Sequence, residues 1–253
     1  MNSIVNNTLN YRVFGNGHPV VLLHGFLESM SMWDCLSFAP NTQQIRIDLP
    51  GHGASILEDE NLSMVTIAMQ VRKLLIELNI SSYTLVGHSM GGYVGLELMK
   101  QDCKCEKLIL FHSNFWEDSQ DKKKDRERVA KIVKKNKTLF IYEAIPNLFM
   151  NPEKNDKVVK NLIQEAIKMN SKAIAINSMA MSKRIDNSNF VENNAHKIIV
   201  IQGENDTIVP SKKMEKFLVQ TKVELIKINN CGHMGHIEKP EEISKILNLF
   251  ISN

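Results

Sequence analysis

Short apolar runs alternate along this chain with longer stretches in which apolar positions recur at helical spacing. The run at 19–23 is continuous, which is typical of a strand buried on both faces of a sheet. We expect strands at 8–14, 19–23, 44–48, 83–86, 107–111, 197–201 and 223–228. Residues 2–5 are a candidate hairpin partner for the first strand, across an Asn6-Asn7 turn.

Helices are predicted between most of these strands. Ser63 is a candidate N-cap for the first of them. Further helices are expected at about 90–100 and 211–219, and a last one has Pro240 near its first turn. Strands and helices in alternation predict an α/β fold, the α/β-hydrolase fold once the motifs below are included, with a mostly parallel central sheet and helices on both faces.

The middle of the chain departs from this alternation. Residues 113–188 contain no strand-like run, and their apolar positions, for example at 158–167 and 173–181, are spaced as in helices. A helical block between two sheet-forming segments indicates an inserted helical cap, or lid. We therefore predict an α/β core formed by 1–112 and 189–253, with a cap at 113–188.

Composition excludes several classes of protein. The chain has 253 residues, 43% of them hydrophobic, and a net charge of only +3, so disorder is not its main state. No apolar run approaches the roughly 20 residues that a spanning helix needs, and the Asn-rich start has no signal-peptide core. Four cysteines do not form a disulfide framework. We expect a cytoplasmic protein that does not associate with membranes.

The basic stretch at 122–137 raises the question of nucleic-acid binding. Acidic residues interrupt its lysines, and apolar residues recur within it at helical spacing. That pattern predicts an amphipathic helix with a solvated face, and no nucleic-acid-binding signature accompanies it. We expect a small-molecule substrate and no nucleic-acid partner.

Candidate chemistry begins at Gly87-His88-Ser89-Met90-Gly91, a G-x-S-x-G pattern. A predicted strand precedes it and a predicted helix follows, which is the setting that a nucleophile elbow requires. The turn is so sharp that only glycine fits at the positions two residues before and two residues after the serine, Gly87 and Gly91. It exposes the Ser89 hydroxyl and points the Met90 N–H, in the first turn of the helix, to where an oxyanion would form.

A serine hydroxyl needs a base, and the base needs an orienting group. Asp206 follows the strand at 197–201, and His233 follows the strand at 223–228. Open α/β sheets place their sites at the carboxyl ends of parallel strands. Ser89, Asp206 and His233 occur there in the order serine, acid, histidine, which is that of the α/β-hydrolase triad.

The chain resembles the α/β-hydrolase superfamily, within its small capped group of esterase-like and aromatic-degradation hydrolases. Only 113–188 falls outside the resemblance. The segments that carry it are His24-Gly25-Phe26, 48–53, 87–92, 203–210 and 232–240.

The resemblance implies that Phe26 supplies a second oxyanion N–H beside that of Met90. It also favours Asp206 over its neighbour Glu204 as the acid, and His233 over His236 as the base.

Together these residues predict a serine carboxylesterase that acts on a small to medium apolar ester through an acyl-enzyme. The chemistry requires no metal and no organic cofactor. Several residues near the motifs or in the cap are candidates to line the substrate pocket, although the histidines among them could equally be packed and hydrogen-bonded. They are His24, His88, Trp116, Phe149 and Met234.

Two alternatives stay open. One is a carbon–carbon bond hydrolase or a lyase that uses the same triad. Such enzymes typically carry other residues at the positions that His88, Tyr93 and Met234 occupy here. The other is a receptor-like protein that binds a ligand on this fold without turnover. Such a protein would be expected to show a damaged triad, and the motifs here are intact.

Overall fold

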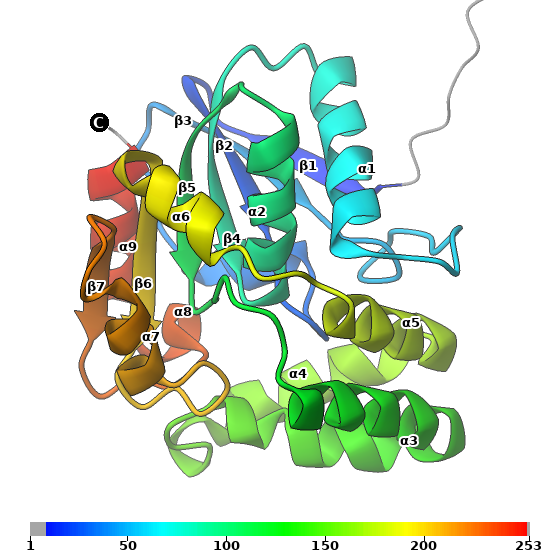
Figure 1. Ribbon diagram of the computed structural model, residues 1–253. Coiled ribbons are helices and arrows are strands. Elements are labelled where there is room, and N and C mark those ends of the chain that lie inside the picture. Colours follow the sequence, from blue (N-terminus) through cyan, green and yellow to red (C-terminus); the bar gives the residue numbers. More distant parts are fainter. Residues whose placement is uncertain (1–8, 252–253) are drawn as a thin grey trace, which may run out of the picture.

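A computed structural model of the chain describes residues 9–251, so the candidate hairpin partner at 2–5 lies outside the described residues. Its centre is a seven-stranded sheet with the strand order β1-β3-β2-β4-β5-β6-β7 (Figure 1). Strand β1 pairs antiparallel with β3, and all other neighbours are parallel. The strands are β1 (Tyr11–Phe14), β2 (His18–Leu23), β3 (Thr42–Ile47), β4 (Tyr83–His88), β5 (Cys105–Phe111), β6 (Ile198–Gly203) and β7 (Glu224–Ile228).

Successive side chains of the central strands enter two different cores, one on each face of the sheet. Val21 and Leu23 pack with the helices α1 (Met64–Glu77) and α2 (Met90–Gln101), which cover the face turned to the viewer in Figure 1. Val20 and Leu22 pack instead with η1 (Met30–Cys35) and α9 (Pro240–Ile251). The sheet is therefore buried on both sides, and the predicted α/β fold is confirmed.

The helix boundaries follow local sequence signals. Ser63 caps α1 in a capping box, because its side chain accepts the Thr66 N–H at 3.1 Å while the Thr66 hydroxyl accepts the Ser63 N–H. The shorter elements η1, α6 (Ser188–Asn193) and α8 (Gly235–Glu238) were not predicted, because one or two turns are too short to show a period.

A third layer, formed by α3 (Gln120–Ala144), α4 (Asp156–Lys168) and α5 (Ser171–Ser182), lies below the sheet in Figure 1. Its apolar side chains pack with Leu27 and Met234, which lie in the loops that follow β2 and β7. The layer therefore covers the carboxyl ends of the strands. These helices fall within 113–188, but the division of the chain into a core and a cap stays a prediction.

The remaining elements are short. They are α7 (Ser211–Leu218), η2 (Pro146–Leu148), η3 (Glu153–Asn155) and η4 (Ala195–Lys197). Over residues 9–251, none of the helices combines the length and the apolar character needed to cross a bilayer.

Candidate active site

The turn from β4 into α2 places Ser89 in a strained conformation. Its φ of 49° and ψ of −113° lie in a region that non-glycine residues rarely occupy. The Ser89 N–H donates to the Phe111 carbonyl at 3.0 Å, and the Ser113 hydroxyl donates to the Ser89 carbonyl at 2.7 Å. These contacts hold the turn, and the Ser89 side chain stays partly accessible.

Two glycines make this turn possible. A Cβ on Gly87 would lie 2.5 Å from the Gly91 carbonyl oxygen, and one on Gly91 would lie 2.3 Å from the Leu23 carbonyl oxygen. Both obstacles are backbone atoms, which cannot move aside without displacing the sheet. The close packing of strand, turn and helix therefore requires glycine at both positions, as the G-x-S-x-G pattern predicts.

Asp206 is buried after β6 and is held by hydrogen bonds on both oxygens. Oδ1 accepts the N–H groups of Ile208 and Val209 at 2.8 and 2.9 Å. Oδ2 lies 2.8 Å from His233 Nδ1 and accepts a hydrogen bond from Gln202 at 2.9 Å. Burial alone would raise the pKa of this carboxyl, but His233 and the hydrogen bonds outweigh it and hold the pKa well below its usual range.

His233 lies in the loop after β7 and is also buried. Because its Nδ1 faces Asp206, its Nε2 is the nitrogen that remains to accept a proton. The ring centroid of His88, the residue before Ser89, lies 5.1 Å from that of His233, so the turn and the base are adjacent. The competing acid Glu204 is exposed to solvent, which favours Asp206.

The candidate oxyanion donors are both unoccupied. Within residues 9–251, neither the Phe26 N–H nor the Met90 N–H donates to another group of the protein. Leu27, with a φ of 67°, turns the chain sharply just after Phe26. Free N–H groups at a helix start and in a tight loop are the donors that an oxyanion would use.

The five pocket candidates lie in different environments. His24 is packed, because its Nε2 accepts the Leu49 N–H at 2.9 Å, and Trp116 stacks on Phe217 at a centroid distance of 4.8 Å. Phe149 and Met234 belong to the apolar cluster that also contains side chains of α3, α4 and α5.

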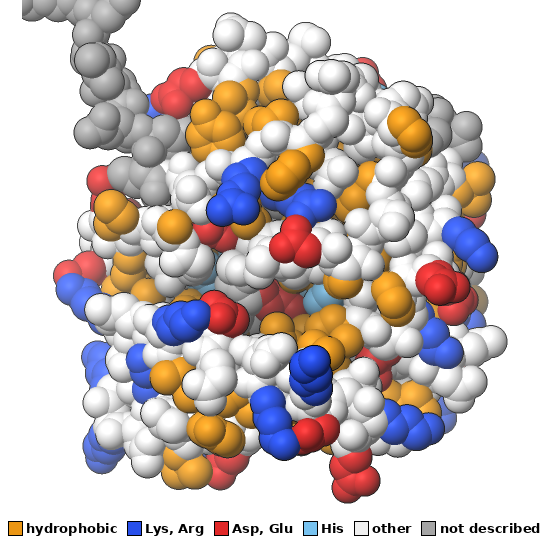
Figure 2. Space-filling model, turned by 180° about the vertical axis from the view of Figure 1, so that it is seen from behind, with side chains coloured by type: hydrophobic (Ala, Val, Ile, Leu, Met, Phe, Trp, Pro, Cys, Tyr) orange, Lys and Arg blue, Asp and Glu red, His pale blue; other side chains and the backbone are white. Residues whose placement is uncertain are grey.

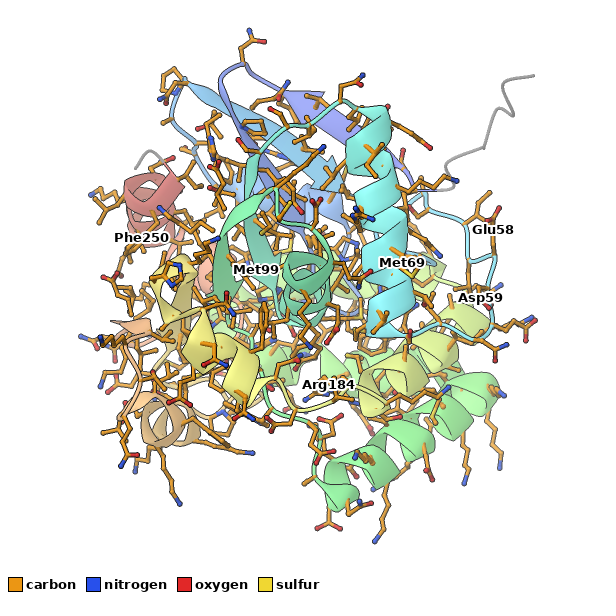
Figure 3. The ribbon with its side chains drawn as sticks, turned by 45° about the horizontal axis from the view of Figure 1, so that its top comes forward. Glu58, Asp59, Met69, Met99, Arg184 and Phe250 are labelled. Atoms are coloured by element: carbon orange, nitrogen blue, oxygen red, sulfur yellow. The ribbon has the colours of Figure 1, made fainter. Side chains whose placement is uncertain are left out.

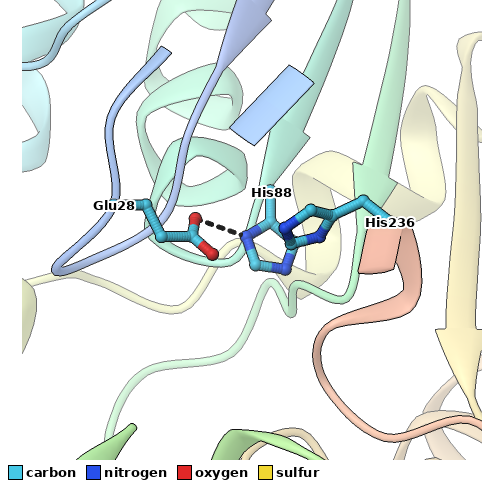
Figure 4. A group of neighbouring side chains, drawn as sticks. All are labelled: Glu28, His88 and His236. Atoms are coloured by element: carbon cyan, nitrogen blue, oxygen red, sulfur yellow. Dashed lines mark hydrogen bonds and ion pairs between the residues drawn. The ribbon is translucent and has the colours of Figure 1, made fainter. Parts of the chain in front are cut away.

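His88, the fifth candidate, belongs to a buried cluster with Glu28 and His236, which the sequence analysis did not anticipate (Figure 4). His88 Nδ1 lies 2.8 Å from Glu28 Oε2. Burial would lower the pKa of His88, but Glu28 outweighs burial and raises it, while burial lowers the pKa of His236 to about 3. No motif signals Glu28, because its contact with His88 joins residues that are distant in sequence.

The same three residues each bring one metal-ligating atom within 4.8 Å of the others. Tetrahedral zinc with ordinary bond lengths separates two of its ligands by about 3.3 Å. The 2.8 Å between Glu28 Oε2 and His88 Nδ1 is shorter and suits a shared proton. The geometry therefore describes a hydrogen-bonded ion pair better than a metal site.

A family model described as the alpha/beta hydrolase fold matches residues 18–240. The chain belongs to the α/β hydrolase family. It is 26% identical to a thermophilic esterase from Thermogutta terrifontis, with a TM-score of 0.90 over 96% of this chain and 93% of that one. An enol-lactonase from Burkholderia xenovorans LB400 has the same fold, with a TM-score of 0.85 at 19% identity over 97% and 96% of the two chains.

Curated relatives agree with this placement. The hydrolase is 26% identical to a putative esterase/lipase of Haemophilus influenzae over 94% of this chain and 84% of that protein. It is 24% identical to a putative 2-succinyl-6-hydroxy-2,4-cyclohexadiene-1-carboxylate synthase of Bacillus subtilis, over 100% of this chain and 98% of the relative.

This α/β hydrolase also has a cavity of about 740 Å³ between its α4–α5 helices and the loops after β2 and β3. Seen from behind, the molecule is hollowed near its middle, where acidic and histidine side chains are visible (Figure 2). The residues that line the cavity include Leu27, Glu28, Leu57, Leu162, Met169 and His236. Neither Ser89 nor any of the five pocket candidates is among the described residues that line it.

Proposed function

We propose that this α/β hydrolase is a serine carboxylesterase that uses Ser89, His233 and Asp206. The observation that carries the proposal is the strained turn that holds Ser89 beside the hydrogen-bonded pair of His233 and Asp206. The esterase from Thermogutta terrifontis and the putative esterase/lipase of Haemophilus influenzae support ester hydrolysis as the reaction.

The proposed reaction has two steps. His233 Nε2 takes the Ser89 proton as the Ser89 oxygen attacks the ester carbonyl, and the Phe26 and Met90 N–H groups bind the resulting oxyanion. His233 then gives the proton to the departing alcohol, which leaves an acyl-enzyme. A water molecule, deprotonated by His233, attacks the acyl group and releases the acid. Asp206 remains ionised and stabilises the His233 cation throughout.

We propose that the α3–α5 layer acts as the cap of this site. The layer lies over the carboxyl ends of the strands, and its apolar cluster includes Leu27, Phe149 and Met234 from the segments around the site. An apolar roof of this kind favours a small to medium apolar ester over a charged metabolite.

Hydrolysis of p-nitrophenyl esters from acetate to decanoate tests the proposal. Ser89→Ala and His233→Ala should each lower kcat about 10⁶-fold, and Asp206→Asn roughly 10⁴-fold or less. The exposed Ser81→Ala serves as the matched control and should retain wild-type rates. Ser89→Ala activity within tenfold of wild type would reject Ser89 as the nucleophile.

A carbon–carbon bond hydrolase or lyase on the same residues is the second candidate. It is favoured by the Bacillus subtilis relative, which is named as a synthase and aligns along nearly its whole length. Failure to hydrolyse any ester of the series, with Ser89 still labelled by a fluorophosphonate, would favour this candidate. Saturable ligand binding with neither turnover nor labelling would favour the receptor-like reading.

A further inference from the structure

One buried carboxylate contacts both the loop after β2 and the end of β4, which precedes Ser89. Glu28 Oε2 accepts the Gly25 N–H at 2.5 Å and lies 2.8 Å from His88 Nδ1. On its other side, His88 Nε2 lies 3.0 Å from the His233 carbonyl oxygen. These contacts link Gly25, Glu28, His88 and His233 in a continuous chain, part of which is drawn in Figure 4.

Each end of this chain is next to a proposed reacting group. Gly25 precedes Phe26, whose N–H is a candidate oxyanion donor. His88 precedes Ser89, and His233 is the proposed base. The loop after β2, the end of β4 and the loop after β7 are thus connected to one another.

This series of contacts requires a positive charge on His88 as well as hydrogen bonds. Both nitrogens of His88 face acceptor oxygens, one from Glu28 and one from the His233 carbonyl. A neutral imidazole has only one N–H and could satisfy only one of them. An imidazolium satisfies both, and the buried carboxylate neutralises its charge.

The backbone of Gly25 lies close against the Glu28–His88 pair. A Cβ on Gly25 would lie 2.6 Å from Glu28 Oε2 and 2.9 Å from His88 Nδ1. The loop backbone therefore packs directly against the ion pair, and a side chain at position 25 would displace it.

We infer that Glu28 is a positioning residue that fixes the Phe26 N–H through Gly25, and the His233 backbone through His88, relative to Ser89. The inference rests on the proposed function and extends it to a residue outside the Ser-His-Asp set. It does not require Glu28 to touch the substrate.

Glu28→Gln tests the inference, because it preserves shape and removes charge. If the amide oxygen takes the Oε2 position, a neutral His88 that donates to it presents a lone pair to the His233 carbonyl. If the amide nitrogen takes that position, it meets the Gly25 N–H. One link is therefore lost in either orientation.

The expected result is a 10- to 100-fold lower kcat on p-nitrophenyl esters with KM changed less than threefold, since alignment acts in the transition state. The fluorophosphonate labelling rate and the affinity for a trifluoromethyl ketone analogue should fall in parallel. The matched control is Glu97→Gln, which removes a buried carboxylate of α2 that pairs with Lys100 and Asn187. It should leave all three readouts at wild-type values.

The outcomes separate the two proposals. If the wild-type protein hydrolyses no ester and is not labelled at Ser89, the proposed function fails and the positioning role fails with it. If the wild type is active and folded Glu28→Gln matches it in kcat and labelling, only the positioning role is rejected. Should Glu28→Gln not fold, His88→Asn removes the same connection from its other end and is judged by the same criteria.

Discussion

At the scale of single residues, the proposed site depends on backbone that only particular side chains allow. Ser89 occupies its unusual conformation because the hydrogen bonds to Phe111 and Ser113 hold it there. Gly91 lets α2 begin in contact with β2, since any side chain would collide with the Leu23 carbonyl. Glycine is thus required at Gly87 by the adjacent turn and at Gly91 by contact with the neighbouring strand.

Gly91→Ala should therefore lower the free energy of unfolding by about 3 kcal/mol, at the upper end of the usual cost of overpacking. Gly95→Ala is the control within the same helix. Its Cβ would meet only the methyl tips of Leu85 and Leu108, at 2.7 and 2.9 Å, and these can rotate away. Its loss should stay near 1 kcal/mol or less, because alanine also gains helix propensity. Equal losses in urea unfolding would contradict this reading of the turn.

At the scale of elements, a buried ion-pair group fastens the α3–α5 layer to the core. Asp118, just before α3, pairs with Arg184, just after α5, at 2.7 Å, and also with Arg126 at 3.3 Å. Arg184, labelled in Figure 3, also lies over the Tyr93 ring of α2 at 4.2 Å. The two chain segments that connect the layer to the sheet are thereby joined to each other and to α2.

Asp118→Asn should cost about 3 kcal/mol in urea unfolding, because it leaves the Arg184 guanidinium buried without its counter-charge. It should also speed proteolysis within α3–α5. The control is Asp156→Asn, which breaks an exposed pair with Lys160 on the same layer. That change should cost less than about 1 kcal/mol. A comparable loss in both variants would show that Asp118 does not anchor the layer.

At the scale of the whole molecule, the charge state of buried histidines connects stability to pH. Burial lowers the pKa of His52 and His236 to about 3 and that of His112 to about 4, so all three are neutral in the folded protein near neutral pH. Unfolding restores an ordinary pKa near 6.5, so the unfolded chain binds more protons below that pH. Their contribution is present above pH 6.5 and is lost progressively as pH falls through the folded pKa values of about 4 and 3.

Each of these three histidines should accordingly lower the free energy of unfolding by about 2 kcal/mol between pH 7.5 and pH 5. Urea unfolding across this range measures the slope. His52→Gln should make the slope shallower, whereas the exposed His196→Gln should leave it unchanged. An unchanged slope in His52→Gln would show that His52 does not contribute.

The sequence by itself determined the features that local patterns encode. Continuous apolar runs located the strands, because a strand buried on both faces needs apolar side chains along its length. The glycines around Ser89 predicted the sharp turn, since the clash that requires Gly87 involves the backbone of Gly91, only four residues away. Asp206 and His233 were proposed because each follows the carboxyl end of a predicted strand, β6 and β7 of the structure.

Only the tertiary structure decided which distant groups meet. The contacts of Glu28 with His88 and of His88 with His233 join residues 60 and 145 positions apart, and no local pattern records them. Periodicity describes one face of one element, whereas these contacts depend on how several elements pack together.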